Sequence, residues 1–368
     1  MPETVDPPLR VVLYNVHRGL GRRWWSRPDA EGIDGNLRRI AGTIARAHPG
    51  GPDVVGLNEV DFASRRTGFV DQARVIARAL EAHTGAAYNV LRGPSWIDAS
   101  EGHEVRYGNA LLIRHPVSFS RSCGFDDLRP CESADPSAPR RAAAAPELPA
   151  PGFGWSWLSS EPRGVTVADA VVRGRPLRVV LTHLDPFTSS LREAQAARIL
   201  HHLTGGPDPV LLLGDLNAVP TALTHRRWWF GSDRTHDVIT SGRLIDARLR
   251  EAQVPTAEEW RRFATYPAHD PQWPLDTVLA SPELTAASMR IIDAGVSDHL
   301  GLAAELAWWK DPTGVAHQER MARAWRHSRI RDILACDRSG GQVRAALHAL
   351  GVRVSESATV GAAPGSRL

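Results

Sequence analysis

The heptapeptide GDLNAVP, residues 214–220, follows the apolar run of residues 209–213 and places Asp215 two positions before Asn217. Side chains two positions apart on an extended chain point to the same side. A carboxylate and a carboxamide held in this way can act together on one ligand. The ordinary structural alternative is an Asx turn that only closes the strand.

Polar side chains also stand at the ends of other apolar runs. They follow the runs 9–14, 54–57 and 177–181. They precede two later runs, 277–279 and 300–306. Since an antiparallel strand begins at the edge where its neighbours end, one rim of a sheet could collect all of these groups. The set is Asn15, Glu59, His183, Asp215, Asn217, Asp276, Asp298 and His299.

Four members of this set are carboxylates: Glu59, Asp215, Asp276 and Asp298. In one cleft they would repel one another, and their pKa values would rise, unless a cation lies among them. Carboxylate and carboxamide oxygens without cysteine favour a hard ion, Mg²⁺ or Mn²⁺. Zinc is less favoured, because no pair of histidines has the spacing of zinc ligands.

Each residue also has an ordinary structural explanation. Asp298 could cap a turn, His183 could be a half-buried histidine bonded to the backbone, and Glu59 could be a solvated residue at a strand end. These explanations do not account for six such strand ends in one chain.

The elements that would position these groups are short apolar strands with some helices between them. We expect strands at residues 9–14, 54–57, 110–113, 165–172, 177–181, 210–213, 277–280 and 302–306. Asp34 and Asp71 are candidate caps for two amphipathic helices, and a third helix is expected over residues 190–203. The later strands have short or irregular connections, so a mixed α+β layered fold fits better than a parallel sheet.

The pattern predicts one large domain over residues 9–308 after a short tail, residues 1–8. Residues 121–152 are rich in Pro, Ala and charge, lack periodicity, and are predicted to be a surface insertion. Residues 309–353 are predicted to form a basic helical extension, and residues 354–368 a disordered tail. The extension could contact DNA or a partner, although such a basic run is more often a solvated helix face.

The composition, 42% hydrophobic and 23% charged, is that of a globular protein. The net charge of +3 and the excess of Arg over Lys are compatible with an anionic substrate. No leader-like segment or long apolar span occurs, so we expect a cytoplasmic protein with no transmembrane segment and no obligate protein partner. Cys123, Cys131 and Cys336 form no metal or disulfide pattern, although Cys123 and Cys131 could pair in an exported chain.

Several motifs in one order resemble the endonuclease/exonuclease/phosphatase superfamily, over about residues 9–306. They are VVGLNEVD, YGNALLIRHP, EPRGVTVADAVV, LTHLD, GDLNAVP, TYPAHDPQWPLDTVLAS and VSDHLGLAAEL. The resemblance implies a four-layer α/β/β/α sandwich of two mixed β-sheets, with the active site on its upper rim. It also implies a metal-dependent phosphodiesterase that cleaves a phosphoester bond by in-line attack of an activated water.

The resemblance also implies residue roles. Glu59, with Asn15 and Asp298, would hold Mg²⁺ or Mn²⁺. Asp215 would deprotonate the water, and Asn217 would donate to the phosphoryl group. His299, paired with Asp276, would donate to a phosphate oxygen, and His183 would help to protonate the leaving oxygen. Asn109 and Arg163, within the matching motifs, would bind substrate.

Two departures from the family pattern concern the shell around these residues. Asn58 stands where many members have Gln, and Pro274-Leu275-Asp276-Thr277 where many have Arg-Ile-Asp-Tyr. The fold does not fix the substrate. The pairs Arg-Arg-Trp-Trp at residues 22–25 and 226–229 would suit nucleic acid, but could equally pack loops, or meet a lipid headgroup or a phosphorylated metabolite. A non-catalytic module that binds phosphorylated ligands or protein is the alternative from another class.

Overall fold

The computed structural model of the chain describes eight segments of the 368 residues. They are residues 7–22, 28–100, 104–125, 161–203, 206–220, 233–240, 244–248 and 257–309. The predicted extension after residue 309, the predicted disordered tail, and the Trp pairs at residues 24–25 and 228–229 lie outside these segments, as does most of the predicted N-terminal tail.

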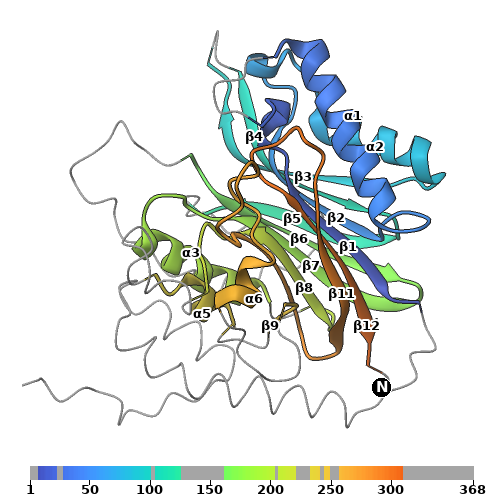
Figure 1. Cartoon of the computed structure of the whole chain (residues 1–368), viewed down its shortest axis with the longest axis vertical. Helices are drawn as coiled ribbons and strands as arrows, with labels where there is room; N and C mark the ends of the chain where they lie inside the picture. Colours follow the sequence, from blue (N-terminus) through green and yellow to red (C-terminus); the bar gives the residue numbers. More distant parts are fainter. Residues whose placement is uncertain are drawn as a thin grey trace, which may run out of the picture.

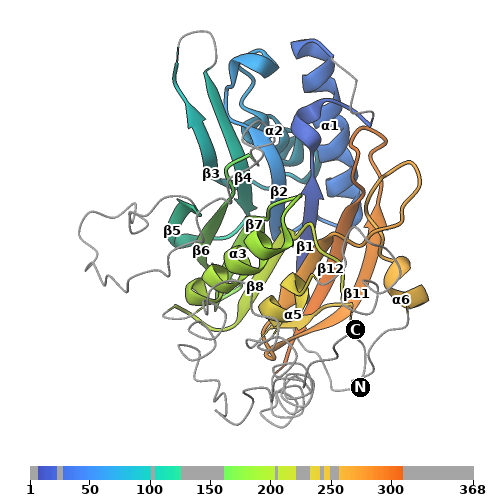
Figure 2. The ribbon, with the colours of Figure 1, turned by 90° about the vertical axis from the view of Figure 1, so that its left-hand side faces the viewer.

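The first sheet has six strands in the order β11-β12-β1-β2-β4-β3. Only β1 and β2 pair in parallel, and the other pairs are antiparallel, so the sheet is mixed. In Figure 2 the β3–β4 hairpin projects beyond the ends of the neighbouring strands. The strands are β1 (Leu9–Asn15), β2 (Val54–Asp61), β3 (Asn89–Asp98), β4 (Val105–Ile113), β11 (Leu284–Ile292) and β12 (Gly301–Trp308).

The second sheet also has six strands, in the order β5-β6-β7-β8-β10-β9. Here β7 and β8 form the parallel pair, and their neighbours run antiparallel. The strands are β5 (Val117–Gly124), β6 (Gly164–Val172), β7 (Arg175–His183), β8 (Val210–Asp215), β9 (Ile245–Asp246) and β10 (Asp276–Ala280).

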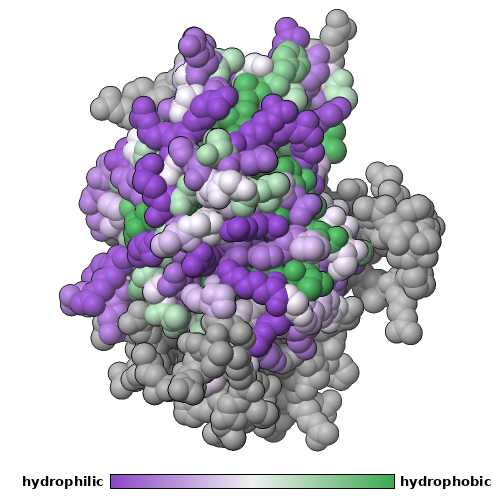
Figure 3. All heavy atoms as spheres, turned by 90° about the vertical axis from the view of Figure 1, so that its right-hand side faces the viewer, coloured by the Kyte–Doolittle hydropathy of each residue, from purple (hydrophilic) through white to green (hydrophobic). Residues whose placement is uncertain are grey.

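Helices cover the outer faces of both sheets, as Figure 1 shows. On one side lie α1 (Ala30–Ala47) and α2 (Gln72–Thr84), and on the other α3 (Ser189–His202) and α5 (Thr235–Thr240). The short elements are α6 (Ala257–Arg261), η1 (His17–Gly19) and η2 (Arg65–Thr67). On the side where α1 and α2 lie, the surface is largely hydrophilic, with apolar residues in small separate areas (Figure 3).

Strand alternation divides the buried residues into three apolar layers. Val12 and Val55 face α1 and α2, whereas Leu13 packs against Leu181 of the other sheet. The outer face of the second sheet, with Val180, packs against α3 and α5. The fold therefore has four layers, in the order helices, sheet, sheet and helices, and one apolar interface lies between each pair of neighbouring layers. This arrangement confirms the predicted four-layer sandwich.

A buried carboxylate joins the two sheets at the end opposite the rim where β1, β7 and β8 finish. Asp53 accepts a hydrogen bond from the Arg10 backbone N–H at 2.9 Å. Arg173 Nη2 donates to both carboxylate oxygens of Asp53, at 2.9 Å to Oδ1 and 2.8 Å to Oδ2. His115 Nε2 lies 2.8 Å from the same carboxylate. Burial alone would raise the pKa of Asp53, but the hydrogen bonds and the Arg173 charge hold it below its usual range.

Three local predictions are corrected by the structure. Helix α1 begins at Ala30 with Asp29 as its cap, because the apolar stripe already starts at Ile33; Asp34 lies inside the helix. Strand β2 continues past residue 57 to Asp61. Strand β5 extends to Gly124, so residues 121–124 of the predicted insertion belong to a strand, and residues 126–152 lie outside the described segments.

No helix in the described segments is long and apolar enough to span a membrane. Cys123 is disulfide-bonded, and both other cysteines, Cys131 and Cys336, lie outside the described residues. The cytoplasmic location stays a prediction.

Candidate active site

Asp215, the last residue of β8, is flanked in the sheet by two other predicted site residues. Its register partner on β7 is His183, and its partner on the antiparallel strand β10 is Asp276. The expectation that an antiparallel strand would bring its first residue to the rim is therefore met for Asp276. All three side chains are buried.

Gly214 has a steric reason to precede Asp215. A Cβ atom at this position would lie 2.7 Å from the Thr182 carbonyl oxygen, closer than real contacts allow. Only glycine lets β7 and β8 approach this closely next to the catalytic candidates.

His299 lies between two carboxylates. Its Nδ1 is 2.8 Å from Asp276 Oδ2, and its Nε2 is 3.6 Å from Asp215 Oδ2. Burial alone would lower the pKa of His299, but the Asp276 and Asp215 charges raise it to about 10. Burial raises the pKa of Asp215, and the Asp276 charge raises it further, to about 6. At neutral pH this arrangement favours an imidazolium beside a carboxylate that can accept a proton.

Asn15 connects the two halves of the rim. Its Nδ2 donates to Glu59 Oε1 at 3.1 Å and to Asp215 Oδ2 at 3.0 Å. The orientation of the amide is fixed by His17, whose backbone N–H donates to Asn15 Oδ1 at 3.0 Å. The oxygen expected to bind metal is thus engaged by the backbone, while the NH₂ group bridges two carboxylates.

Glu59 lies at a bulge inside β2, not past the end of a strand. The register with β4 shifts between Leu57 and Val60, and Glu59 has φ 57°. A bulge re-aims a side chain, here toward the rim. Burial alone would raise the pKa of Glu59, but neighbouring basic side chains, including His183 and Arg18, hold it well below its usual range.

Asn58 ties the two sheets together directly behind the site. Its Nδ2 donates to Asn109 Oδ1 at 2.8 Å and to the Thr182 carbonyl at 2.9 Å, and its Oδ1 accepts from the Asp215 backbone at 3.1 Å. The residue is fully buried. The shorter side chain found here in place of the family's glutamine therefore has every polar atom in use.

His183 links Asn217 to Arg163. Arg163 Nη1 lies 2.9 Å from His183 Nδ1, and Asn217 Nδ2 lies 3.0 Å from His183 Nε2. Both partners are donors, so a neutral imidazole can accept from only one of them. His183 Nε2 also lies 3.6 Å from Asp215 Oδ2. Burial lowers the pKa of His183 well below its usual range, and Arg163 lowers it further. Because His183 is neutral, it is better suited to position Asn217 and Arg163 than to donate a proton to the leaving oxygen, the role predicted from sequence.

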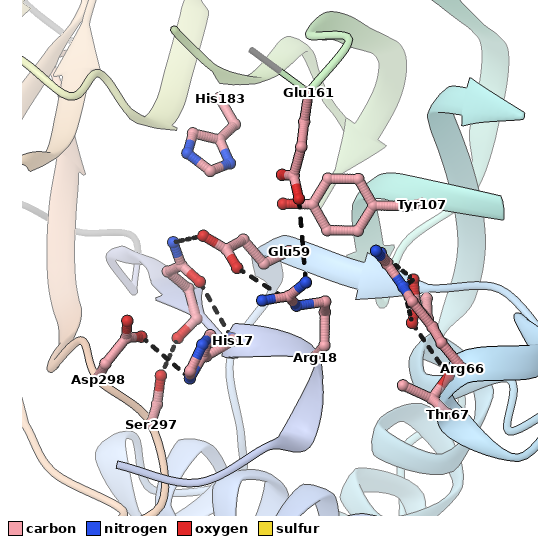
Figure 4. A network of polar contacts seen from close by, with 12 residues as sticks. His17, Arg18, Glu59, Arg66, Thr67, Tyr107, Glu161, His183, Ser297 and Asp298 are labelled. Atoms are coloured by element: carbon pink, nitrogen blue, oxygen red, sulfur yellow. Dashed lines mark hydrogen bonds and ion pairs between the residues drawn. The ribbon is translucent and has the colours of Figure 1, made fainter. Parts of the chain in front are cut away.

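Two residues of the site were not predicted from sequence, His17 and Arg18. His17 Nδ1 is 3.6 Å from Asp298 Oδ1, and Arg18 Nε is 4.0 Å from Glu59 Oε2 (Figure 4). They lie in η1, which begins two residues after Asn15. The ten predicted site residues are thus connected to one another by contacts, directly or through a neighbouring side chain. Arg22, which was predicted to meet substrate, instead pairs with Asp293 at 2.6 Å.

Two groups of side chains could hold a cation. Ligand atoms of Asp215, Asp276 and His299 lie within 4.8 Å of one another. A protonated His299 already supplies the positive charge there. Around Glu59 and Asp298 the donors are hard oxygens, and Asp298 Oδ1 is buried without a hydrogen-bond partner. Burial also raises the pKa of Asp298. This second group therefore fits a hard divalent ion.

Comparisons with known proteins agree with this architecture. The model of the Endonuclease/Exonuclease/phosphatase family matches residues 12–299. No curated protein matches the sequence. An endonuclease/exonuclease/phosphatase from Beutenbergia cavernae superposes with a TM-score of 0.58 at 22% identity, over 82% of this chain and 72% of that one.

Two further solved structures share the fold. The catalytic domain of human Nocturnin with a bound sulfate anion gives a TM-score of 0.51 at 20% identity, over 82% of this chain and 94% of that one. A mannosyl-6-phosphatase from Bacteroides thetaiotaomicron gives 0.51 at 15% identity, over 82% and 100%. At such identities the likeness concerns the fold alone.

Proposed function

The chain belongs to the endonuclease/exonuclease/phosphatase family, and from this premise we propose that it is a divalent-metal-dependent phosphoester hydrolase, of the nuclease-type phosphodiesterase kind. The observation that supports this most is the contact between Asp215, whose pKa is raised to about 6, and a His299–Asp276 pair. A proton acceptor and a proton donor held beside each other are what in-line attack of water on a phosphoester needs.

Glu59 and Asp298 would hold the metal, Mg²⁺ or Mn²⁺. When bound, the ion supplies charge stabilisation to the phosphoryl oxygens. We reassign Asn15 from predicted ligand to a bridge that keeps the Glu59 and Asp215 carboxylates together. Asp298, held near His17, would complete the oxygen ligands.

The protein's own groups would perform the proton chemistry. Asp215 would orient the water and take its proton. His299, kept charged by Asp276, would donate to a phosphate oxygen as negative charge accumulates. Asn217 would donate to the phosphoryl group through one Nδ2–H, while the other donates to the Leu184 carbonyl at 2.9 Å and fixes the amide. Asn109 and Arg163 would contact substrate.

Two other functions follow from the same site. A phosphatase for a phosphorylated metabolite or lipid headgroup is favoured by the fold shared with the mannosyl-6-phosphatase. A non-catalytic module would bind phosphoryl ligands without turnover. Asp215 lies between a charged His299 and a neutral His183, and this arrangement favours catalysis over binding alone.

A substrate panel tests these alternatives. The full-length protein is incubated with plasmid, single-stranded oligonucleotides, phospholipids and sugar phosphates, with Mg²⁺, with Mn²⁺ or with chelator. We expect metal-dependent cleavage of a nucleic acid and none by Asp215→Asn. Hydrolysis of lipid or sugar phosphate alone would replace the nuclease assignment, and turnover that survives chelator would overturn the metal dependence.

A further inference from the structure

The carboxylate of Glu161 bridges two arginines beside the reaction centre. Glu161 Oε1 lies 3.9 Å from Arg18 Nη1, and Glu161 Oε2 lies 3.5 Å from Arg163 Nη2. Figure 4 shows Glu161 and Arg18 facing each other next to Glu59. Both arginines have a buried Nε without a hydrogen-bond partner. These long contacts leave the guanidinium groups with unused donors.

Arg18 is held in place by its backbone. Its φ and ψ are 54° and 20°, and the preceding His17 has φ 46°. Buried Gln72 fixes this loop, because its Nε2 donates to the Arg18 carbonyl at 2.6 Å while its Oε1 accepts from the Asp61 backbone. Strained conformations that the surrounding structure enforces cluster at functional sites. The loop thus presents a preorganised guanidinium.

The two arginines reach the reaction centre by different contacts. Contacts run from His299 to Asp215, then through Asn15 to Glu59, and from Glu59 to Arg18 and Glu161. Arg163 contacts His183, whose Nε2 is 3.6 Å from Asp215 Oδ2, so the two arginines lie beside the proton-transfer pair. The Arg18 side chain is 23% exposed and that of Glu161 is 32% exposed, so a ligand can reach both.

We propose that Arg18 and Arg163 form a second anion-binding site, which takes a phosphate of the substrate next to the scissile one. The Glu161 carboxylate occupies this site until that phosphate displaces it. Guanidinium groups match phosphate oxygens in geometry and charge, and a carboxylate bridging two of them occupies the place of such an anion. The place of this phosphate beside the scissile one rests on the proposed function, whereas anion binding itself does not.

Binding of inorganic phosphate to chelator-treated, full-length protein, followed by calorimetry, tests the site without turnover. Arg18→Gln should weaken binding about 10-fold or more, the scale of a lost charge-assisted hydrogen bond. Glu161→Gln should tighten it by about 3-fold, because the internal competitor loses its charge. Arg65→Gln, which removes an arginine that within the described segments forms an ion pair with Glu104 at the surface, should change nothing.

The two substitutions are expected to change the phosphate affinity in opposite directions, which makes the test decisive. Equal phosphate affinity in the wild type, Arg18→Gln and Glu161→Gln would overturn the proposal, and so would weaker binding by Glu161→Gln. Thermal unfolding of each variant identifies a folding defect, and Arg18→Lys, which keeps the charge but loses the planar fork, should fall between the wild type and Arg18→Gln.

Kinetics with Mg²⁺ then connect the site to the substrate. Dinucleotides with and without a 5′-phosphate form one pair of substrates, and a sugar bisphosphate and its monophosphate another. The pair that the wild-type protein hydrolyses identifies the source of the second phosphate. The preference of the wild type for the member of that pair with the additional phosphate should fall about 10-fold in Arg18→Gln. An unchanged preference would overturn the assignment. Arg18-dependent phosphate binding without hydrolysis of any substrate would overturn the proposed function but not the anion site.

Discussion

Replacing Asn58 by alanine tests whether one buried amide holds the two sheets in register behind the site. The change removes three hydrogen bonds, of 2.8, 2.9 and 3.1 Å. It takes a hydrogen-bond partner from three buried groups: the Asn109 side-chain oxygen, the Thr182 carbonyl and the Asp215 N–H. Each unpaired buried group costs about 1–3 kcal/mol.

The expected loss lies near the lower end of that sum, about 3 kcal/mol, since Asn109 can turn and water can enter the space left behind. A domain is stable by about 5–15 kcal/mol, so Asn58→Ala should remain folded at 25 °C. Its activity should fall about 10-fold to 100-fold, because Asp215 loses the bond that fixes its backbone. Urea denaturation measures the first effect and steady-state kinetics the second.

Asn89→Ala is the matched control. Asn89 also donates two hydrogen bonds to the backbone, at 3.2 and 2.8 Å, but it is exposed and lies at the start of β3, away from the rim. It should lose less than about 1 kcal/mol and no activity. If Asn58→Ala and Asn89→Ala had the same urea midpoint and the same kcat, the role given to Asn58 would be wrong.

Four other substitutions have definite expected outcomes. His299→Asn and Asp276→Asn should each lower kcat at least about 100-fold with the metal present, the scale of a positioned acid or oxyanion donor, and a loss below 10-fold would contradict their pairing. Asp53→Asn should cost about 1–3 kcal/mol at neutral pH. Because the folded-state pKa of Asp53 lies below its unfolded value of 3.8, its contribution is complete above that pH and disappears as pH falls further. Denaturation from pH 7 to pH 3 should therefore show the wild type converging on the variant, and a constant gap would refute this. Gly214→Ala should impair both folding and turnover through its clash with the Thr182 carbonyl, which a comparison of melting temperature and kcat would reveal.

The interior strands could be predicted from sequence because they are apolar on both faces. All eight predicted strands occur, and each lies inside its sheet. The four that were missed, β3, β5, β9 and β11, are the four edges. An edge strand such as β3, with Pro94 and several half-buried polar residues, gives no continuous apolar signal.

The site could be predicted where a residue type ends an apolar strand, and not where its role depends on a neighbour. Asp215 and His299 were identified from their positions. The orientation of Asn15 could not be, because it is set by the His17 backbone. Arg18 was missed because nothing in the letters HRG shows a left-handed backbone that turns the side chain toward Glu59.

Backbone strain at the rim explains why so much buried polar structure surrounds it. Four non-glycine residues with positive φ belong to the site: His17, Arg18, Glu59 and Asn217. At about 1–2 kcal/mol for each, they cost about 4–8 kcal/mol together, which is comparable to the whole stability of a domain. The apolar layers and the fully bonded Asn58 and Gln72 offset that cost. Glycine would relieve the strain at each position but would remove the side chains to which we assign binding or reaction, so on the proposed function the strain is retained with them.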